Sequence, residues 1–248
     1  MDANQSQKGG FLNQERWQDN PSLRTIYREF HQAIAAQLSG LPEPLVVELG
    51  SGIANIKEVI PNCLRTNLFP NPWIDQIENA YTLTFADGTV SDLILFEEFM
   101  HLRHPGTALR EFERVLRPGG RLIVFDPFIS LLGLIVFGMS QREPIGWRDD
   151  IIWNTPASWS VKDSDDYTAQ GNATRIFFGR LATSLLKNWK IVCRKRLAAF
   201  AYVTSGRYSN RPLYPERFYP QIRALDHFFD SVPVLFATRA LVVLEKPA

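Results

Sequence analysis

The chain of 248 residues contains only two cysteines, Cys63 and Cys193, which lie far apart in the sequence. Two distant cysteines offer neither a disulfide framework nor the close pair typical of zinc sites, and the four histidines show no ligand spacing. We therefore predict no metal site. A low cysteine count is also typical of a reducing compartment, so we expect a cytoplasmic protein.

The sequence also lacks an excess of charge of either sign. Its 27 Lys and Arg residues nearly balance its 26 Asp and Glu residues, and the formal net charge is +1. Domains that bind nucleic acid usually carry a basic patch or a strongly basic composition. The balance therefore predicts that nucleic acid is not a partner.

No apolar run is long enough to cross a bilayer. The longest, FISLLGLIVFGM at Phe128–Met139, has about half of the ~20 residues that a transmembrane helix needs, so we expect a buried or interfacial helix there. The first residues, MDANQSQKGG, have no apolar core of the kind found in signal peptides. We predict that residues 1–20 form a disordered tail.

Apolar segments with strand character alternate with segments of helical periodicity. We predict strands at 45–49, 63–68, 91–96, 121–127, 189–199 and 240–245, and helices at 24–38, 53–60, 107–116, 176–186 and 216–229. This alternation is typical of an α/β domain, here residues 21–248, with a mostly parallel sheet covered by helices on both faces. Two insertions, at about 128–175 and 202–220, follow predicted strands. Because ligands bind beyond the carboxyl ends of such strands, we expect these insertions to cover the substrate.

The sequence ELGSG, Glu48 to Gly52, connects the first predicted strand to a helix. Glycine tolerates positive φ and lets a ligand approach the main chain, and a helix N-terminus supplies N–H donors. Two glycines in this spacing are equally consistent with a plain turn. Glu48 would repel a pyrophosphate and attract an ammonium group. The turn therefore indicates a cationic or zwitterionic cofactor rather than a dinucleotide.

Three segments in order, ELGSG, TLTFADGTVSDLILFEEFMHL and ALREFERVLRPGGRLIVFDP, resemble the class I S-adenosylmethionine-dependent methyltransferases, and in particular their small-molecule branch. The resemblance covers about residues 46–127. It implies a Rossmann-like, seven-stranded, mostly parallel sheet whose last strand is antiparallel. It also implies S-adenosyl-L-methionine as the cofactor and a small molecule as the methyl acceptor.

The resemblance further implies a set of cofactor-binding residues at the ends of the strands and in the turns after them. They are Glu48, Gly50, Ser51, Gly52, Asn67, Asn79, Ala80 and Phe96. Asn67 and Asn79 stand where the family usually has acids, at the ribose hydroxyls and near the adenine. Each replacement weakens a hydrogen bond by about 1 kcal/mol. Asp75 or Glu78 could take their place, and each asparagine could equally be an ordinary loop residue.

Candidates for acting on the acceptor follow other strands. His101, after the fourth predicted strand, is the catalytic candidate if the acceptor must lose a proton, and otherwise it bonds the backbone. His104 is a weaker candidate, and Asp126 is a base or, preferably, the cap of a turn. Three residues of the segment AYVTSGRYSN are substrate-binding candidates for an acidic or phenolic acceptor, unless this segment is a solvated loop: Tyr202, Arg207 and Tyr208.

The insertion at 128–175 is aromatic, with Trp147, Trp153 and Trp159 near the apolar segment Phe128–Met139. This composition favours a lipophilic or aromatic acceptor, lipid-linked or met at a membrane surface, or else a helix buried in the core or in a homodimer interface. Two other functions stay open. The chain could be a degenerate relative that binds a ligand without catalysis, or a nicotinamide-dependent oxidoreductase, which the missing third glycine and Glu48 disfavour.

Overall fold

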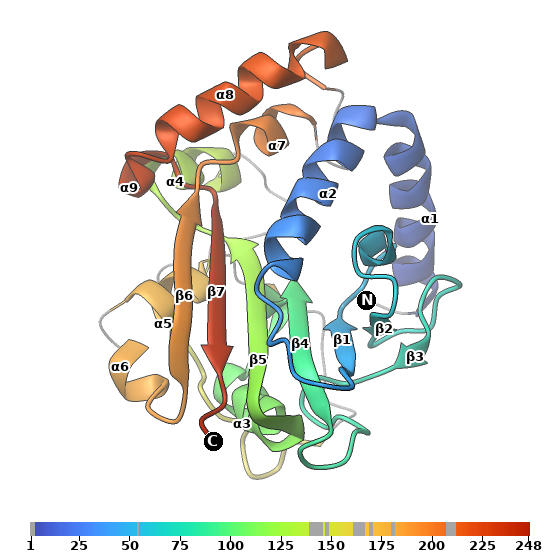
Figure 1. Cartoon of the computed structure of the whole chain (residues 1–248), viewed down its shortest axis with the longest axis vertical. Helices are drawn as coiled ribbons and strands as arrows, with labels where there is room; N and C mark the ends of the chain where they lie inside the picture. Colours follow the sequence, from blue (N-terminus) through green and yellow to red (C-terminus); the bar gives the residue numbers. More distant parts are fainter. Residues whose placement is uncertain are drawn as a thin grey trace.

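The structure is a computed structural model, and it describes residues 3–53, 55–138, 146, 149–160, 167–168, 171–179, 182–206 and 212–248. A seven-stranded sheet in the order β3-β2-β1-β4-β5-β7-β6 runs through it (Figure 1). The strands are β1 Val46–Leu49, β2 Leu64–Asn67, β3 Gln76–Ile77, β4 Val90–Phe96, β5 Leu116–Pro127, β6 Lys190–Leu197 and β7 Arg239–Glu245.

The direction of the strands confirms the predicted fold. Strands β1 to β5 pair in parallel, whereas β7 is antiparallel to both of its neighbours, β5 and β6. β7 is the last strand of the chain, and it lies between the two strands that precede it in the sequence. The result is the mostly parallel, Rossmann-like sheet that the sequence predicts.

Helices cover both faces of the sheet (Figure 1). They are α1 Ala3–Asp19, α2 Pro21–Ala35, α3 Pro105–Val115, α4 Leu131–Gly138, α5 Asn172–Phe178, α6 Ala182–Leu185, α7 Phe200–Thr204, α8 Tyr219–Phe229 and α9 Pro233–Phe236, with short 3-10 helices η1 Asn55–Glu58, η2 Phe99–His101 and η4 Glu216–Phe218. None of the described helices is both long and apolar enough to cross a membrane.

The core lies in two layers because successive strand residues point to opposite faces. In β4, Leu93 and Leu95 pack with the buried residues of α3 and α5 on one face. Ile94, between them, packs with the buried residues of α2 and α7 on the other face. The strands read as almost continuously apolar since both faces are covered.

The prediction of a disordered tail is wrong for residues 3–19, which form α1. Trp17 is 6% exposed, and its ring lies edge-on to Tyr27 with the ring centroids 5.3 Å apart. Phe11 makes a similar contact with Trp73 at 5.1 Å. The helix is therefore stabilised by tertiary contacts, which its own polar, glycine-containing sequence does not reveal.

Two other predicted helices differ in detail from the structure. The predicted helix at 176–186 is divided into α5 and α6, and the one at 53–60 contains only the single turn η1. The apolar segment from Phe128 does contain a helix, α4. Phe137 of α4 is buried, but Leu131 and Ile135 are more than half exposed.

Candidate functional site

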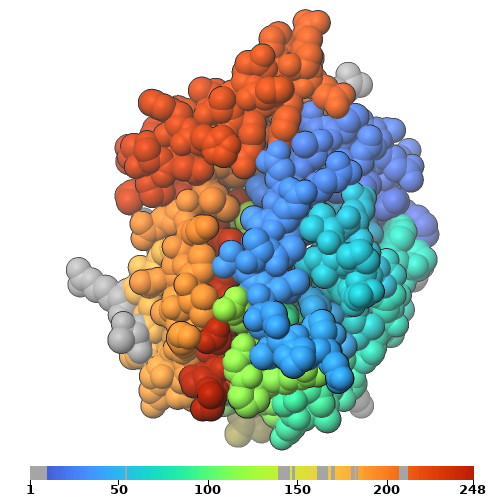
Figure 2. Space-filling view, viewed as in Figure 1, coloured from blue at the N-terminus to red at the C-terminus, as the bar shows by residue number. Residues whose placement is uncertain are grey.

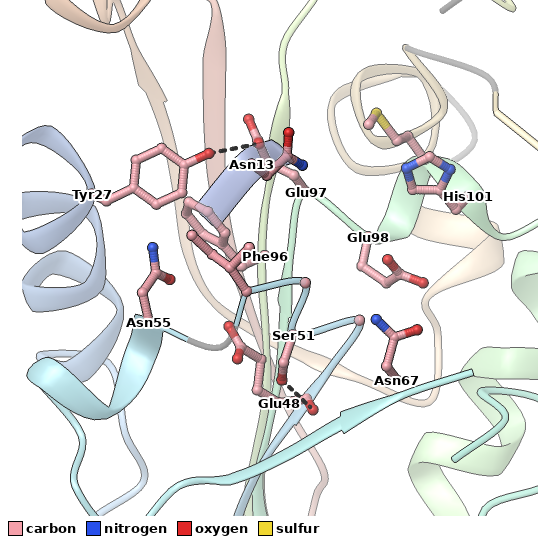
Figure 3. Close-up of a pocket in the computed structure, with 14 residues that line it drawn as sticks. Asn13, Tyr27, Glu48, Ser51, Asn55, Asn67, Phe96, Glu97, Glu98 and His101 are labelled. Atoms are coloured by element: carbon pink, nitrogen blue, oxygen red, sulfur yellow. Dashed lines mark hydrogen bonds between the residues drawn. The ribbon is translucent and has the colours of Figure 1, made fainter. Parts of the chain in front are cut away.

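A pocket of about 340 Å³ lies at the carboxyl ends of β1, β2 and β4 (Figure 3). Its volume is in the range of small-molecule sites. The structure brings seven of the predicted site residues to this pocket: Glu48, Gly50, Ser51, Gly52, Asn67, Phe96 and His101. Figure 3 shows Tyr27 and Glu97 on one side of it and Asn67, Glu98 and His101 on the other.

The turn after β1 is fixed to β2 by Ser51 and Thr66. The Ser51 N–H donates to the carbonyl of Thr66 at 2.8 Å, and the Thr66 N–H donates to Ser51 Oγ at 3.1 Å. The Thr66 hydroxyl also donates to the carbonyl of Glu48 at 2.9 Å. The Ser51 N–H, expected as a donor to a ligand, is therefore already used inside the fold, and Ser51 holds the turn in place.

Glu48 carries a buried carboxylate without a full set of partners. The side chain is 3% exposed, and its Oε2 atom has no hydrogen-bond partner among the residues that the structure describes. Burial raises the pKa of Glu48 from an ordinary 4.5 to about 7. A buried anionic oxygen is costly unless a cation or donor compensates it. The residues present therefore fit a ligand that places an ammonium group beside Glu48.

Gly50 is required by both its backbone and its surroundings. Its φ is +73°, in the left-handed region that side chains disfavour. A Cβ atom at this position would clash with the side chain of Glu98, which would then have to move. Burial raises the pKa of Glu98, and His101 opposes this rise. A second carboxylate thus approaches the turn closely, which strengthens the preference for a cationic ligand.

The two asparagines are both engaged with their own loops. Asn67 lines the pocket, but its Oδ1 accepts from the N–H of Phe69 at 3.2 Å. Oδ1 of Asn79 accepts from the N–H of Tyr81 at 2.9 Å. Neither Asn79 nor Ala80 is among the described residues that line the pocket, and Ala80 packs against the core.

The two acids considered as substitutes are also engaged. Asp75 pairs with Arg65 at 2.7 Å and with Lys57 at 2.9 Å, and the hydrogen bonds from Arg65 lower its pKa. Glu78 is 4% exposed, and its Oε2 accepts from the N–H of Thr84 at 2.9 Å. Neither carboxylate lines the pocket in the described part of the chain.

His101 is the only one of the three acid–base candidates that reaches the pocket in the described part of the chain. Its Nδ1 lies 3.0 Å from the carbonyl of Tyr167 and 2.9 Å from Oγ1 of Thr168. His104 is 4% exposed, with Nδ1 3.3 Å from the carbonyl of Ile152. Asp126 accepts from the N–H of Phe99, the first residue of η2, at 3.1 Å. It therefore caps this turn, which is the role that the sequence analysis preferred.

The predicted substrate-binding residues fall in two groups. Arg207 and Tyr208 lie outside the described residues, as does Trp147. Tyr202 is 3% exposed in α7 and faces the protein interior rather than a solvated loop. The other two tryptophans of the insertion contact neighbouring segments. The carbonyl of Trp153 accepts from the N–H of Gly106 at 2.8 Å, and the Trp159 ring lies edge-on to Tyr81.

Glu97 is a pocket residue that the sequence analysis missed. Three groups hold its carboxylate: Arg239 pairs with Oε1 at 2.6 Å, and the hydroxyls of Tyr202 and Tyr27 donate to it at 3.1 and 3.4 Å. The Glu97 backbone has a φ of +57°. The acid pair directly after β4, Glu97 and Glu98, was a visible signal, but the partners of Glu97 come from α2, α7 and β7.

Comparison with known proteins agrees with this architecture. The family model described as "Methyltransferase domain" matches residues 56–124. No curated protein sequence matches the chain.

Three solved structures illustrate the similarity of fold. A methyltransferase dependent on S-adenosylmethionine from Thermotoga maritima is 15% identical, with a TM-score of 0.54 over 94% of this chain and 93% of that one. A geranyl diphosphate methyltransferase in complex with S-adenosylmethionine is 11% identical, with a TM-score of 0.52 over 88% and 85%. The cyclase SpnF is also 11% identical, with a TM-score of 0.50 over 89% and 81%.

The matched domain contains β2, β4 and α3, and the sheet order around it is that of the predicted seven-stranded fold. The glycine turn with its buried acid lies just before the matched residues, at the carboxyl end of β1. The chain therefore shares the fold of S-adenosylmethionine-dependent methyltransferases, and residues 56–124 match the methyltransferase domain model.

Proposed function

We propose that the protein transfers a methyl group from S-adenosyl-L-methionine to a small-molecule acceptor in the pocket at the carboxyl ends of β1, β2 and β4. The observation that carries the proposal is the buried carboxylate of Glu48, which lies beside a turn that favours glycine. Its Oε2 has no partner in the described part of the chain. The solved complex of the geranyl diphosphate methyltransferase with S-adenosylmethionine supports this cofactor for the shared fold.

Four pocket residues have a role toward the cofactor in this proposal. Glu48 and Glu98 receive the ammonium group, and Gly50 lets the ligand and Glu98 approach the main chain. Phe96 forms an apolar wall, and its ring stacks on Phe125 with centroids 5.4 Å apart. When bound, the cofactor supplies a methyl group that is already activated by its sulfonium. The protein then has to align the acceptor and exclude water, which in favourable cases contributes about 7–11 kcal/mol.

The acceptor in this proposal is a lipophilic or aromatic small molecule. The pocket wall contains Tyr27, Phe96 and Met100, whose side chains suit such a ligand. His101 is the group in reach of the pocket that could take a proton from a hydroxyl or amine. Its Nδ1 is held by the segment Tyr167–Thr168, which orients the ring.

Calorimetric titration with S-adenosylmethionine and S-adenosylhomocysteine tests the cofactor. We expect binding by the wild type and a loss of roughly tenfold in Gly52→Ala, where the new methyl group enters the pocket at a φ of +49°. Gly88→Ala is the matched control, because Gly88 also has positive φ, +61°, and an unobstructed Cβ position, but lies outside the pocket lining. Absence of binding by the wild type at millimolar cofactor would refute the proposal.

A binding protein without methyl transfer is the second candidate. Asn67 and Asn79 favour it because their amide oxygens are used by their own loops. The cyclase SpnF shows that a similar fold also occurs in a protein named for a different reaction. Binding of S-adenosylmethionine without formation of S-adenosylhomocysteine, across a panel of lipophilic phenols and amines, would favour this candidate.

A further inference from the structure

An exposed apolar patch lies at one end of the molecule, away from the pocket lining. Figure 1 shows α4, α8 and α9 gathered at this end, and α4 and α9 are in contact. We define the α4–α9 patch as Leu131, Leu134 and Ile135 of α4 with Val234 and Leu235 of α9, all of which are at least 42% exposed. Phe228, near the end of α8, is 70% exposed.

Such a patch indicates an interaction site. Single exposed apolar residues are ordinary, but several large ones on adjoining elements mark surfaces that bind partners or membranes. The helix α4 has the sequence LLGLIVFG and contains no charged or polar side chain. A surface helix whose outer face meets only water usually presents polar side chains there. In α4 the exposed side chains of Leu131 and Ile135 are alkyl groups.

Two arginines border the patch, and neither has a carboxylate partner among the described residues. Arg194 and Arg196 of β6 line a cavity of about 360 Å³ together with Phe178 and with Pro233, the first residue of α9. The Arg196 guanidinium lies 4.9 Å from the centre of the Phe178 ring, and its buried Nε has no hydrogen-bond partner. Arg194 donates to the carbonyl of Phe177 at 3.1 Å. Within the described residues, neither arginine pairs with an acid.

We propose that the α4–α9 patch and these two arginines form a docking surface for a bilayer that contains anionic lipid. A bilayer offers apolar chains to α4 and α9 and lipid phosphates to the guanidinium groups, whose donor fork matches phosphate oxygens. The proposal concerns where the protein binds, and it stands whether or not the pocket transfers methyl groups.

A second copy of the chain fits this surface less well. In a two-fold symmetric dimer the patch meets itself, so the arginines of both copies come to the same interface. The described residues around Arg194 and Arg196 supply no carboxylate to neutralise them. Unpaired like charges in a contact are costly, while lipid phosphates would neutralise them.

Flotation of the full-length protein with vesicles tests the proposal. We expect binding to vesicles of phosphatidylcholine with phosphatidylglycerol, weaker binding to phosphatidylcholine alone, and a loss of affinity as salt is raised. Ile135→Ser should weaken binding roughly tenfold because it removes exposed alkyl groups that would enter the bilayer. Arg194→Gln should weaken binding about fivefold, and only to the anionic vesicles.

Two matched variants control for general effects. Ile77→Ser changes a residue of β3, at the edge of the sheet opposite to β6. Ile77 is 52% exposed, close to the 54% of Ile135. Arg110→Gln removes an exposed arginine of α3 that, among the described residues, bonds the neutral side chains of Asn154 and Thr107 and no acid. Both should bind vesicles like the wild type, and circular dichroism should show that all four variants fold.

Three results would overturn the proposal. The first is a wild-type protein that does not float with anionic vesicles. The second is an equal loss of binding in Ile135→Ser and Ile77→Ser. The third is a stable wild-type dimer in light scattering that becomes a monomer in Ile135→Ser, since a second copy would then cover the patch.

Discussion

Replacing Glu48 by glutamine should stabilise the protein in a pH-dependent way. Glu48 is 3% exposed, and burial raises its pKa from 4.5 to about 7. In the unfolded chain the carboxyl ionises near its ordinary pKa, so between these two values the folded state holds more protons. The free energy of unfolding therefore falls as the pH rises through this window, by about 3 kcal/mol in total.

The substitution Glu48→Gln removes this titration. Because glutamine carries no charge at any pH, the variant should gain stability relative to the wild type as the pH rises, by up to about 3 kcal/mol at about pH 8 compared with about pH 5. Asp126, whose pKa burial raises to about 7, titrates in the same window in both proteins. The difference between the two proteins therefore isolates Glu48.

Urea denaturation followed by tryptophan fluorescence measures the effect at each pH. Glu216→Gln, which changes an exposed glutamate of η4, should follow the wild type and serves as the control. A difference between Glu48→Gln and the wild type that is the same at both pH values would refute the reasoning, since the carboxylate would then already be compensated within the protein. The ligand gives a second readout: S-adenosylmethionine should bind the variant at least tenfold more weakly.

Two further substitutions test the geometry of the site. Gly50→Ala should lower the free energy of unfolding by about 1–2 kcal/mol and abolish cofactor binding, because its φ is +73° and its methyl group would meet Glu98. Gly40→Ala is the control, since Gly40 has a φ of +72° and no described neighbour within 4 Å of its Cβ position. Calorimetry should show that this control binds the cofactor like the wild type. Arg239→Leu should lower the free energy of unfolding, measured by urea denaturation, by about 3–5 kcal/mol because it leaves Glu97 without its cation. Adding Glu97→Gln to this variant should recover part of that loss. No recovery in the double variant would show that Arg239 acts through packing rather than through the ion pair.

The sheet could be predicted from the sequence because its strands are covered on both faces. β4 and β5 contain the apolar runs LILF and LIVF, and such runs are typical of buried parallel strands. β3 has only Gln76 and Ile77, which form no pattern, and it exists because they pair with β2. α1 was missed for a similar reason, since the contacts of Trp17 that stabilise it join it to α2.

The candidate site was also predictable only in part. Glu48, Gly50 and Gly52 are close in sequence, so their motif was sufficient to predict that they lie together at the end of the first strand, and the structure places them in the pocket. Glu97 also lies in the pocket, but the residues that hold it come from distant parts of the chain: Arg239 from β7 and Tyr202 from α7. Local sequence contains no information on such a cluster, which only the packed sheet assembles.

The charges at this edge of the sheet bear on the choice between an enzyme and a degenerate relative. Glu97 is fully compensated by Arg239 and two tyrosine hydroxyls, as expected for a group that maintains the fold. Glu48 is only partly compensated, because its Oε2 has no hydrogen-bond partner among the described residues, and its burial costs stability in the unliganded protein. A binding partner with an ammonium group would return that stability, whereas a protein that no longer bound such a ligand would be more stable with a neutral side chain at this position. The unpartnered oxygen of Glu48 therefore favours a pocket that still binds a cation.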